Sequence, residues 1–159
     1  MNKDLTVGMF VTCCIHTVCY GFHMMLAPEG RKDIFKVLYE QMPTSVLDHL
    51  SVVYDAACQA GEYCVKREPD LFAFTNFFVD RFHGVTHTCS NFWKLSAYPG
   101  LVDIVSSSNE SLNDFLQQFH SAAAYMKQST VMRFVKFLTG VRNWLITKKH
   151  THNVRMFSA

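Results

Sequence analysis

Residues 51–80 have the sequence SVVYDAACQAGEYCVKREPDLFAFTNFFVD, in which two short apolar runs flank a segment with helical patterning. The runs at residues 49–55 and 76–82, around Val53 and Val79, are continuous rather than alternating, which is typical of strands buried on both faces of a parallel sheet. Between them, residues 56–68 carry a helical pattern that Pro69 stops, because proline cannot continue a helix. This order predicts that the two strands are adjacent and parallel.

The residues before this stretch predict three further elements. Residues 6–16 and 17–26 are expected to form neighbouring strands, followed by a break at residues 27–30. Residues 31–42 carry apolar side chains at helical spacing and predict an amphipathic helix that Pro43 ends. The element order is therefore strand, strand, helix, strand, helix, strand, which indicates an α/β fold.

The C-terminal third of the chain is predicted to be helical and basic. An irregular stretch from residue 82 to 103 is followed by the capping residues of SSSNESL (106–112) and by two long helices with apolar residues at helical spacing. Acidic residues stop at Asp114, and seven basic residues follow. This asymmetry favours contact with a polyanion, although a solvated helix face would give the same charge pattern.

Composition restricts the class of protein. A chain of 159 residues with 49% hydrophobic content can bury a substantial core and does not belong to the disordered class. No N-terminal segment has the pattern of a secretory signal, so the six cysteines indicate thiols in a reducing, intracellular setting rather than a disulfide scaffold. The apolar stretch from Val7 to Leu26 is interrupted by His16 and His23, which favours buried strands over a membrane helix.

Two acids are candidates for catalysis. Asp55 follows a predicted strand, and ligands of open α/β sheets collect at the carboxyl ends of strands. The alternative is that Asp55 caps the next helix. Glu110 lies at the start of a predicted long helix, where the helix dipole alone would also favour an acid.

A group of nitrogen and sulfur ligands follows the second parallel strand. His83, His87 and Cys89, with Cys58 near the end of the first parallel strand, would suit a tetrahedral Zn²⁺ ion. Two loop histidines and a buried thiol are the alternative. A second group, which consists of Cys13, Cys14, His16 and Cys19, lies on predicted strands whose side chains alternate between faces, so core packing is the better interpretation there.

Six motifs occur in series along the chain: YDAACQ (54–59), KREPDLF (66–72), FFVDRFHGVTHTCS (77–90), LSAYP (95–99), SSNESLN (107–113) and AAAYMKQSTVMRFVKFLTGVRNW (122–144). Together they resemble the catalytic region of the Kyakuja-Dileera-Zisupton (KDZ) family of DNA transposases, from about Val7 to Trp144. The resemblance implies a ribonuclease-H-like fold that carries an acidic triad of the DDE type.

The resemblance also implies roles for particular residues. Asp55 corresponds to the second acid of the triad and Glu110 to the third, with Mg²⁺ or Mn²⁺ as the ions they hold. The structural zinc ligands implied are Cys58, His83, His87 and Cys89. The family pattern has two residues between the second histidine and the cysteine, where this chain has only Thr88, and a tryptophan where this chain has Gly84.

The first acid of the triad is expected on a strand that would precede the strand predicted at residues 6–16. The chain is therefore expected to be a single partial core over residues 1–159: an incomplete ribonuclease-H-like fold, first strand missing, with long C-terminal helices and a basic helical part at about 109–150. The function expected is that of a fragment or decayed copy of a DDE-type transposase, inactive alone unless another acid such as Asp80 or Asp103 completes the site. The alternative is a non-catalytic, zinc-stabilised domain that binds nucleic acid or protein.

The expected partner is DNA, and no membrane is expected. A functional transposase would act in the nucleus, and assembly into a homo-oligomer is left open. The residues expected to contact DNA are Arg133, Lys136, Arg142, Lys148 and Lys149. Asp55 and Glu110 are expected to lie within about 10 Å of each other, which one or two bridging ions can span.

Overall fold

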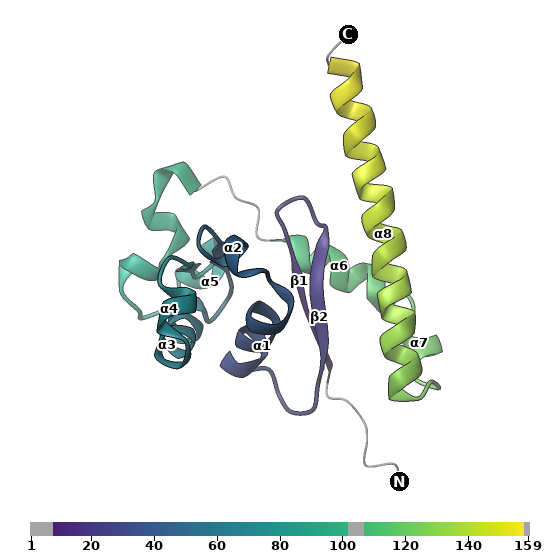
Figure 1. The fold of residues 1–159 in the computed structure, drawn as a ribbon, viewed down its shortest axis with the longest axis horizontal. Helices are drawn as coiled ribbons and strands as arrows, with labels where there is room; N and C mark the ends of the chain where they lie inside the picture. Colours follow the sequence, from purple (N-terminus) through teal and green to yellow (C-terminus); the bar gives the residue numbers. More distant parts are fainter. Residues whose placement is uncertain (1–7, 102–106, 158–159) are drawn as a thin grey trace. The chain divides into compact units, whose positions relative to one another are not determined.

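The computed structural model of the chain describes residues 8–101 and 107–157, with side chains described as far as Lys149. Its helices and strands are drawn in Figure 1. They fall into two compact units: unit 1 consists of residues 1–28 and 107–159, and unit 2 of residues 29–106. The expectation of a single core over residues 1–159 stays a prediction.

Unit 2 contains the two predicted parallel strands and the helices around them. In chain order its elements are α1 (Arg31–Gln41), α2 (Thr44–Leu47), β3 (Ser51–Val53), α3 (Ala57–Arg67), α4 (Pro69–Phe72), β4 (Asn76–Phe78) and α5 (Arg81–Gly84), followed by 3₁₀ turns at Asn91–Trp93, Leu95–Ala97 and Pro99–Leu101. The amphipathic helix predicted before Pro43 and the helix predicted before Pro69 are both confirmed as α1 and α3.

Strands β3 and β4 pair in parallel, with Val52 opposite Phe77 and Val53 opposite Phe78. The prediction that these runs are adjacent and parallel is therefore confirmed. Strand β4 is shorter than the apolar run suggested. Its continuation ends at Asp80, whose carboxylate accepts hydrogen bonds from the backbone N–H groups of Phe82 and His83 at 2.7 and 2.9 Å. This cap turns the chain into α5.

The core of unit 2 lies where α3 packs on β4 and on α1. Ala57, Ala60 and Cys64 are fully buried on one face of α3, and Val37 of α1 is fully buried as well. Gly61 lies on the same face, where an added Cβ atom would come within 2.7 Å of Trp93 Cζ3 and 3.1 Å of Phe77 Cβ. Glycine at this position therefore permits the close approach of α3.

Unit 1 combines an antiparallel hairpin with the C-terminal helices. Its elements are β1 (Gly8–Cys13), β2 (Cys19–Met25), α6 (Ser108–Gln117), α7 (His120–Ala123) and α8 (Gln128–Phe157). The hairpin confirms the predicted neighbouring strands, and its register shifts between Thr12 and Cys13. Figure 1 shows α6 and α8 beside the hairpin, and Leu112 of α6 is fully buried.

Side chains of α8 fix the end of the hairpin. The Asn143 amide accepts a hydrogen bond from the Cys19 N–H at 2.8 Å and donates one to the Cys19 carbonyl at 2.8 Å. It thus satisfies both backbone groups of Cys19, as a neighbouring strand would. These contacts join residues 124 positions apart in the sequence.

The prediction of a mixed α/β fold is confirmed. Within the described residues the strands pair two by two, β1 with β2 and β3 with β4. None of the helices in that part of the chain is long and apolar enough to cross a membrane.

Replacement of Gly61 by alanine should destabilise unit 2. The added methyl group would collide with the Trp93 ring and the Phe77 side chain, and overpacking of this kind costs about 1–3 kcal/mol of unfolding free energy. Gly100→Ala is the matched control, since nothing lies within 4 Å of a Cβ atom there. Urea unfolding of both variants measures the difference, and equal midpoints would contradict the packing described for α3.

Candidate functional site

Two aspartates lie at the same edge of the parallel strand pair. The last paired rung joins Val53 to Phe78, and each strand reaches an aspartate two residues later, Asp55 on one side and Asp80 on the other. Because parallel strands end at the same edge of a sheet, this register brings the two carboxylates together. The edge is the kind of place where open α/β sheets bind ligands.

His83 completes this group. Its Nδ1 atom lies 2.5 Å from Asp80 Oδ2 and 3.3 Å from Asp55 Oδ1. The short helix α5, capped by Asp80, directs the imidazole back toward the strand ends. One ligand atom from each of the three residues lies within 4.8 Å of the others, so Asp55, Asp80 and His83 could hold one metal ion.

The two carboxylates of this cluster differ in environment. The Asp80 side chain is 7% exposed, whereas that of Asp55 is 63% exposed. Burial acts to raise the pKa of Asp80, but hydrogen bonds from the His83 backbone and imidazole bring this pKa below its ordinary value. Desolvation and the proximity of Asp80 raise the pKa of Asp55, and Glu29 adds to the effect. Asp80 is therefore the fixed anion and Asp55 the accessible one.

The alternative role for Asp55, a helix cap, does not hold. Helix α3 begins at Ala57 without a hydrogen bond from a capping side chain, and the Asp55 carboxylate faces His83 instead. Two oxygen ligands and one imidazole form a mostly hard donor set with room for water, which suits Mg²⁺ or Mn²⁺.

A second cluster joins Cys58, His87 and Cys89. The Cys58 Sγ atom lies 3.7 Å from His87 Nδ1, and the ligand atoms of all three residues lie within 4.8 Å of one another. Burial and the neighbouring Cys89 thiol raise the pKa of Cys58. Two sulfur atoms and one imidazole are the ligands that Zn²⁺ prefers, with a fourth position left for another ligand.

His83 does not belong to this second cluster. The sequence grouped it with the three soft ligands, but the structure directs its ring toward Asp55 and Asp80. The physical reason is the Asp80 cap, which places residue 83 on the side of the strand ends, whereas His87 lies beyond the end of α5. Three of the four predicted zinc ligands are thus together, and the fourth is in the carboxylate cluster.

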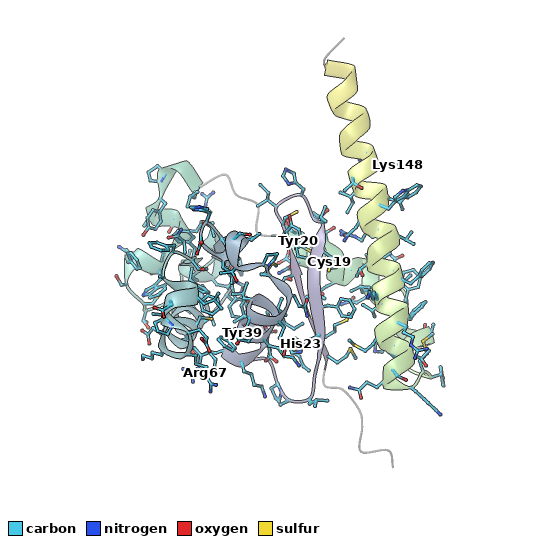
Figure 2. All side chains as sticks on the ribbon, viewed as in Figure 1. Cys19, Tyr20, His23, Tyr39, Arg67 and Lys148 are labelled. Atoms are coloured by element: carbon cyan, nitrogen blue, oxygen red, sulfur yellow. The ribbon has the colours of Figure 1, made fainter. Side chains whose placement is uncertain are left out.

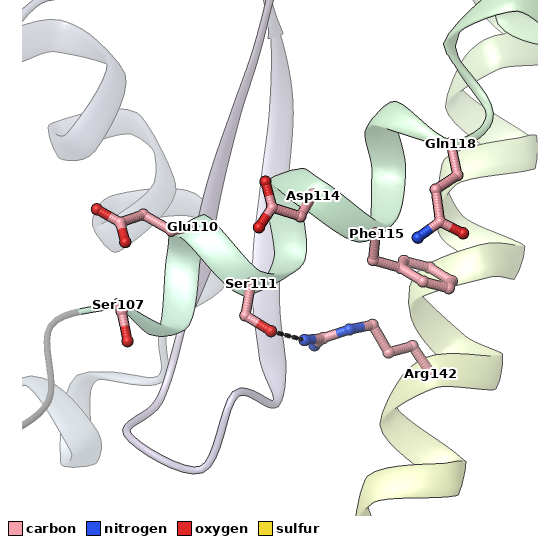
Figure 3. Close-up of a pocket in the computed structure, with 7 residues that line it drawn as sticks. All are labelled: Ser107, Glu110, Ser111, Asp114, Phe115, Gln118 and Arg142. Carbon is pink, nitrogen blue, oxygen red and sulfur yellow. Dashed lines mark hydrogen bonds between the residues drawn. The ribbon is translucent and has the colours of Figure 1, made fainter.

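Glu110 lies in unit 1, in the first turn of α6, and its side chain is exposed. It borders a pocket of about 430 Å³ whose other lining residues are Ser107, Ser111, Asp114, Phe115, Gln118 and Arg142. Figure 3 shows the acids on α6 and Arg142 on α8, with the hydrogen bond to Ser111 dashed. Since Glu110 and Asp55 belong to different units, their expected approach stays a prediction; Asp103 lies outside the described residues.

The basic residues predicted to contact DNA all lie on α8, but they are not equivalent. Arg133, Lys136, Lys148 and Lys149 are exposed, and Lys148 is labelled on α8 in Figure 2. Arg142 instead donates hydrogen bonds to the Thr17 carbonyl at 2.5 Å and to Ser111 Oγ at 3.1 Å. Its guanidinium also lies 5.7 Å from the centre of the Phe115 ring. Arg142 therefore holds unit 1 together.

The residue that the sequence interpretation undervalued is Asp80. A signal was present, because VVYD and FFVD each place an aspartate after three residues of strand pattern. Two such runs in a parallel pair predict two carboxylates at one edge. The predicted strand extended to residue 82 and therefore included Asp80. An aspartate inside a strand does not mark the end of the strand, so the pairing of Asp80 with Asp55 was not predicted.

Comparison of the chain with protein-family models, with curated proteins and with solved structures finds no match. The kind of site must therefore be inferred from the ligands that it contains. Unit 2 carries a cluster of mainly hard ligands at Asp55, Asp80 and His83, and a cluster of soft ligands at Cys58, His87 and Cys89.

The different roles of Arg142 and Arg133 are testable by alanine substitution. Arg142→Ala should lower the unfolding free energy by about 1–3 kcal/mol, because the Thr17 carbonyl loses a charged donor. Arg133→Ala is the control for an exposed residue of the same helix, and it should change stability by less than about 0.5 kcal/mol. Thermal or urea unfolding gives both values. Equal stabilities for the two variants would show that Arg142 is a surface charge.

Proposed function

We propose that the chain belongs to the catalytic core of a DDE-type DNA transposase of the KDZ kind, and that by itself it binds DNA and a divalent cation without turning over. The observation that carries this proposal is the meeting of Asp55, Asp80 and His83 at the carboxyl edge of two parallel strands. The motif YDAAC gives Asp55 the role of a triad acid, and Asp80 supplies a second carboxylate beside it.

The local chemistry supports this role. A divalent cation would supply Lewis-acid activation of water and of a phosphoryl oxygen. Asp80, held by the His83 imidazole and two backbone N–H groups, offers a fixed anionic ligand. Asp55 is exposed and available to a ligand from solvent. Two-metal catalysis needs several bridging acids, and the described residues at this edge provide two carboxylates, so we expect cation binding but no cleavage.

The order of the elements is compatible with a ribonuclease-H-like core. An antiparallel hairpin, β1–β2, precedes a helix and then two parallel strands separated by a helix. In the proposed assignment β3 carries the second acid of the triad and α6 carries the third, Glu110.

The charge distribution supports DNA as the partner. Unit 1 contains eight basic and three acidic residues, which gives a net charge of +5, while unit 2 contains seven and ten, which gives −3. Arg133, Lys136 and Lys148 lie exposed on α8, where lysine and arginine neutralise phosphates and release counterions. As a transposase, the protein would act in the nucleus.

A second candidate function is a non-catalytic domain that zinc stabilises and that binds nucleic acid or protein. The observation that favours it is the convergence of Cys58, His87 and Cys89 beside the carboxylate cluster. Zinc bound by these residues would tie the start of α3 to the loop after α5, and metal binding of this kind contributes directly to folding.

The cation and DNA proposal predicts a specific loss in one variant. One equivalent of Mn²⁺ should bind the full chain with moderate affinity. Asp80→Asn should weaken this binding at least about tenfold, which corresponds to 1.4 kcal/mol of binding free energy. Asp70→Asn is the matched control, because Asp70 is an exposed acid of the same unit. Isothermal titration calorimetry measures the affinities. An equal change of Mn²⁺ affinity in the two variants would contradict the proposed cation site.

DNA binding should be tested on the same protein. Fluorescence anisotropy with a duplex oligonucleotide should show that the DNA-binding constant K depends strongly on salt. Arg133→Ala should reduce the slope of log K against log [salt] by about 1. Denaturing gels should show no nicking with Mg²⁺ or Mn²⁺. Metal-dependent cleavage that Asp55→Ala abolishes would overturn the proposed inactivity, and salt-independent binding would overturn DNA as the partner.

The zinc candidate predicts unequal effects of two neighbouring histidines. His87→Ala should lose bound zinc because it removes a ligand from the sulfur cluster. His83→Ala is the matched control and should keep zinc, since that ring faces Asp55 and Asp80. Metal content of the purified proteins, measured by mass spectrometry after dialysis, gives the answer. Loss of zinc in both variants, or in His83→Ala alone, would contradict the assignment of ligands.

A further inference from the structure

Two cysteines face each other at the closed end of the hairpin in unit 1. Cys13 ends β1 and Cys19 begins β2, and the two residues are cross-strand partners in the ladder. Cys19 is labelled on β2 in Figure 2. Both residues are partly exposed.

Strand pairing brings the two cysteines close together. Residues directly opposite each other in an antiparallel pair have Cα atoms about 4.5–5.5 Å apart, which is within the range that a disulfide spans. The Cys19 thiol donates a hydrogen bond to the Gly21 carbonyl at 3.5 Å. Core packing, the interpretation based on sequence, does not require this cross-strand placement.

The backbone around the pair is held in place from outside the hairpin. Asn143 binds both the N–H and the carbonyl of Cys19 at 2.8 Å. Arg142 donates to the carbonyl of Thr17, which lies in the connecting turn with a φ of 63°. The turn is closed by hydrogen bonds from Cys14 N–H to Val18 and from Thr17 N–H to Cys14. The separation between the two cysteines is thus fixed by α8 as well as by strand pairing.

The pKa values of the two thiols are shifted in opposite directions. Interaction with the Cys13 thiol lowers the pKa of Cys19, and the positive charge of Arg142 acts in the same direction, while burial opposes both. The same interaction, with burial, raises the pKa of Cys13. Because the thiolate is the nucleophile in thiol chemistry, we expect Cys19 to attack first. By contrast, burial raises the pKa of Cys64 to about 12, which makes it inert.

We propose that Cys13 and Cys19 form a reversible intramolecular disulfide when the protein meets a peroxide. The Cys19 thiolate attacks one oxygen of hydrogen peroxide, the O–O bond breaks, and the departing hydroxide takes up a proton as water while Cys19 becomes a sulfenic acid. The Cys13 sulfur then attacks the Cys19 sulfur. The S–O bond breaks, the S–S bond forms, and the Cys13 proton leaves with the hydroxide as a second water. A thiol such as glutathione reduces the disulfide by exchange.

The disulfide would act on the part of unit 1 that meets α8. It closes the turn of residues 14–18, whose Thr17 carbonyl binds Arg142. A cross-link across this turn restricts the unfolded chain and keeps the Thr17 carbonyl in position. Oxidised protein should therefore unfold at a higher urea concentration than reduced protein.

The test uses the full chain and hydrogen peroxide, with free thiols blocked by iodoacetamide before digestion. Cys13, Cys14 and Cys19 fall in one tryptic peptide, residues 4–31. After oxidation this peptide should carry a single alkyl group, on Cys14, and after dithiothreitol treatment it should carry three. Cys14→Ser should still form the disulfide and carry none.

Two variants decide between the proposal and its rivals. Cys13→Ser should form no disulfide within this peptide and should instead leave Cys19 as a sulfenic acid that dimedone traps. A disulfide within this peptide of Cys13→Ser, which must then join Cys14 and Cys19, would overturn the proposal. So would wild-type protein in which this peptide stays fully alkylated under peroxide. Because the wild-type result is decisive alone, the test does not depend on the folding of any variant.

Discussion

The parallel pairing of β3 and β4 is the constraint on which the candidate site depends. Its register fixes Val53 opposite Phe78, and this alone places Asp55 and Asp80 at one edge. Asp80 then has a double role, because its carboxylate caps α5 and also binds the imidazole that α5 presents. A shift of one rung would separate Asp55 from Asp80 and from the His83 ring that Asp80 holds. Strand pairing, helix capping and metal-ligand geometry are therefore one connected arrangement.

The two clusters of unit 2 divide the ligands by chemical type. Oxygen donors gather at the strand ends, while sulfur donors gather between the start of α3 and the loop after α5. Hard cations such as Mg²⁺ prefer the first kind of site, and Zn²⁺ prefers the second. The position of His83 separates them, because its pairing with Asp80 leaves His87 as the imidazole of the sulfur cluster. A cation exchanged at one site therefore need not disturb the other.

Sequence patterns predicted those parts of the fold that are local or periodic. Continuous apolar runs indicated the parallel strands, and Pro43 and Pro69 marked helix ends. The orientation of the His83 side chain could not be predicted. It depends on the single helical turn α5, and Asp80, which caps this turn, is also the partner of the imidazole in the site. The structural role of Arg142 could not be predicted either, because charge alone does not distinguish it from Arg133. Its partner Thr17 lies 125 residues away in the sequence.

We propose that cations bind at the strand ends of unit 2. The most direct test is an amide-resolved NMR titration of the full chain with Mn²⁺, because a bound paramagnetic ion broadens nearby signals. Broadening should begin at residues 54–56 and 79–83, with Asp70 and its neighbours affected later. Broadening that begins at Glu110 and Asp114 on α6 and spares residues 54–56 and 79–83, or that shows no preferred residues, would contradict cation binding at the strand ends.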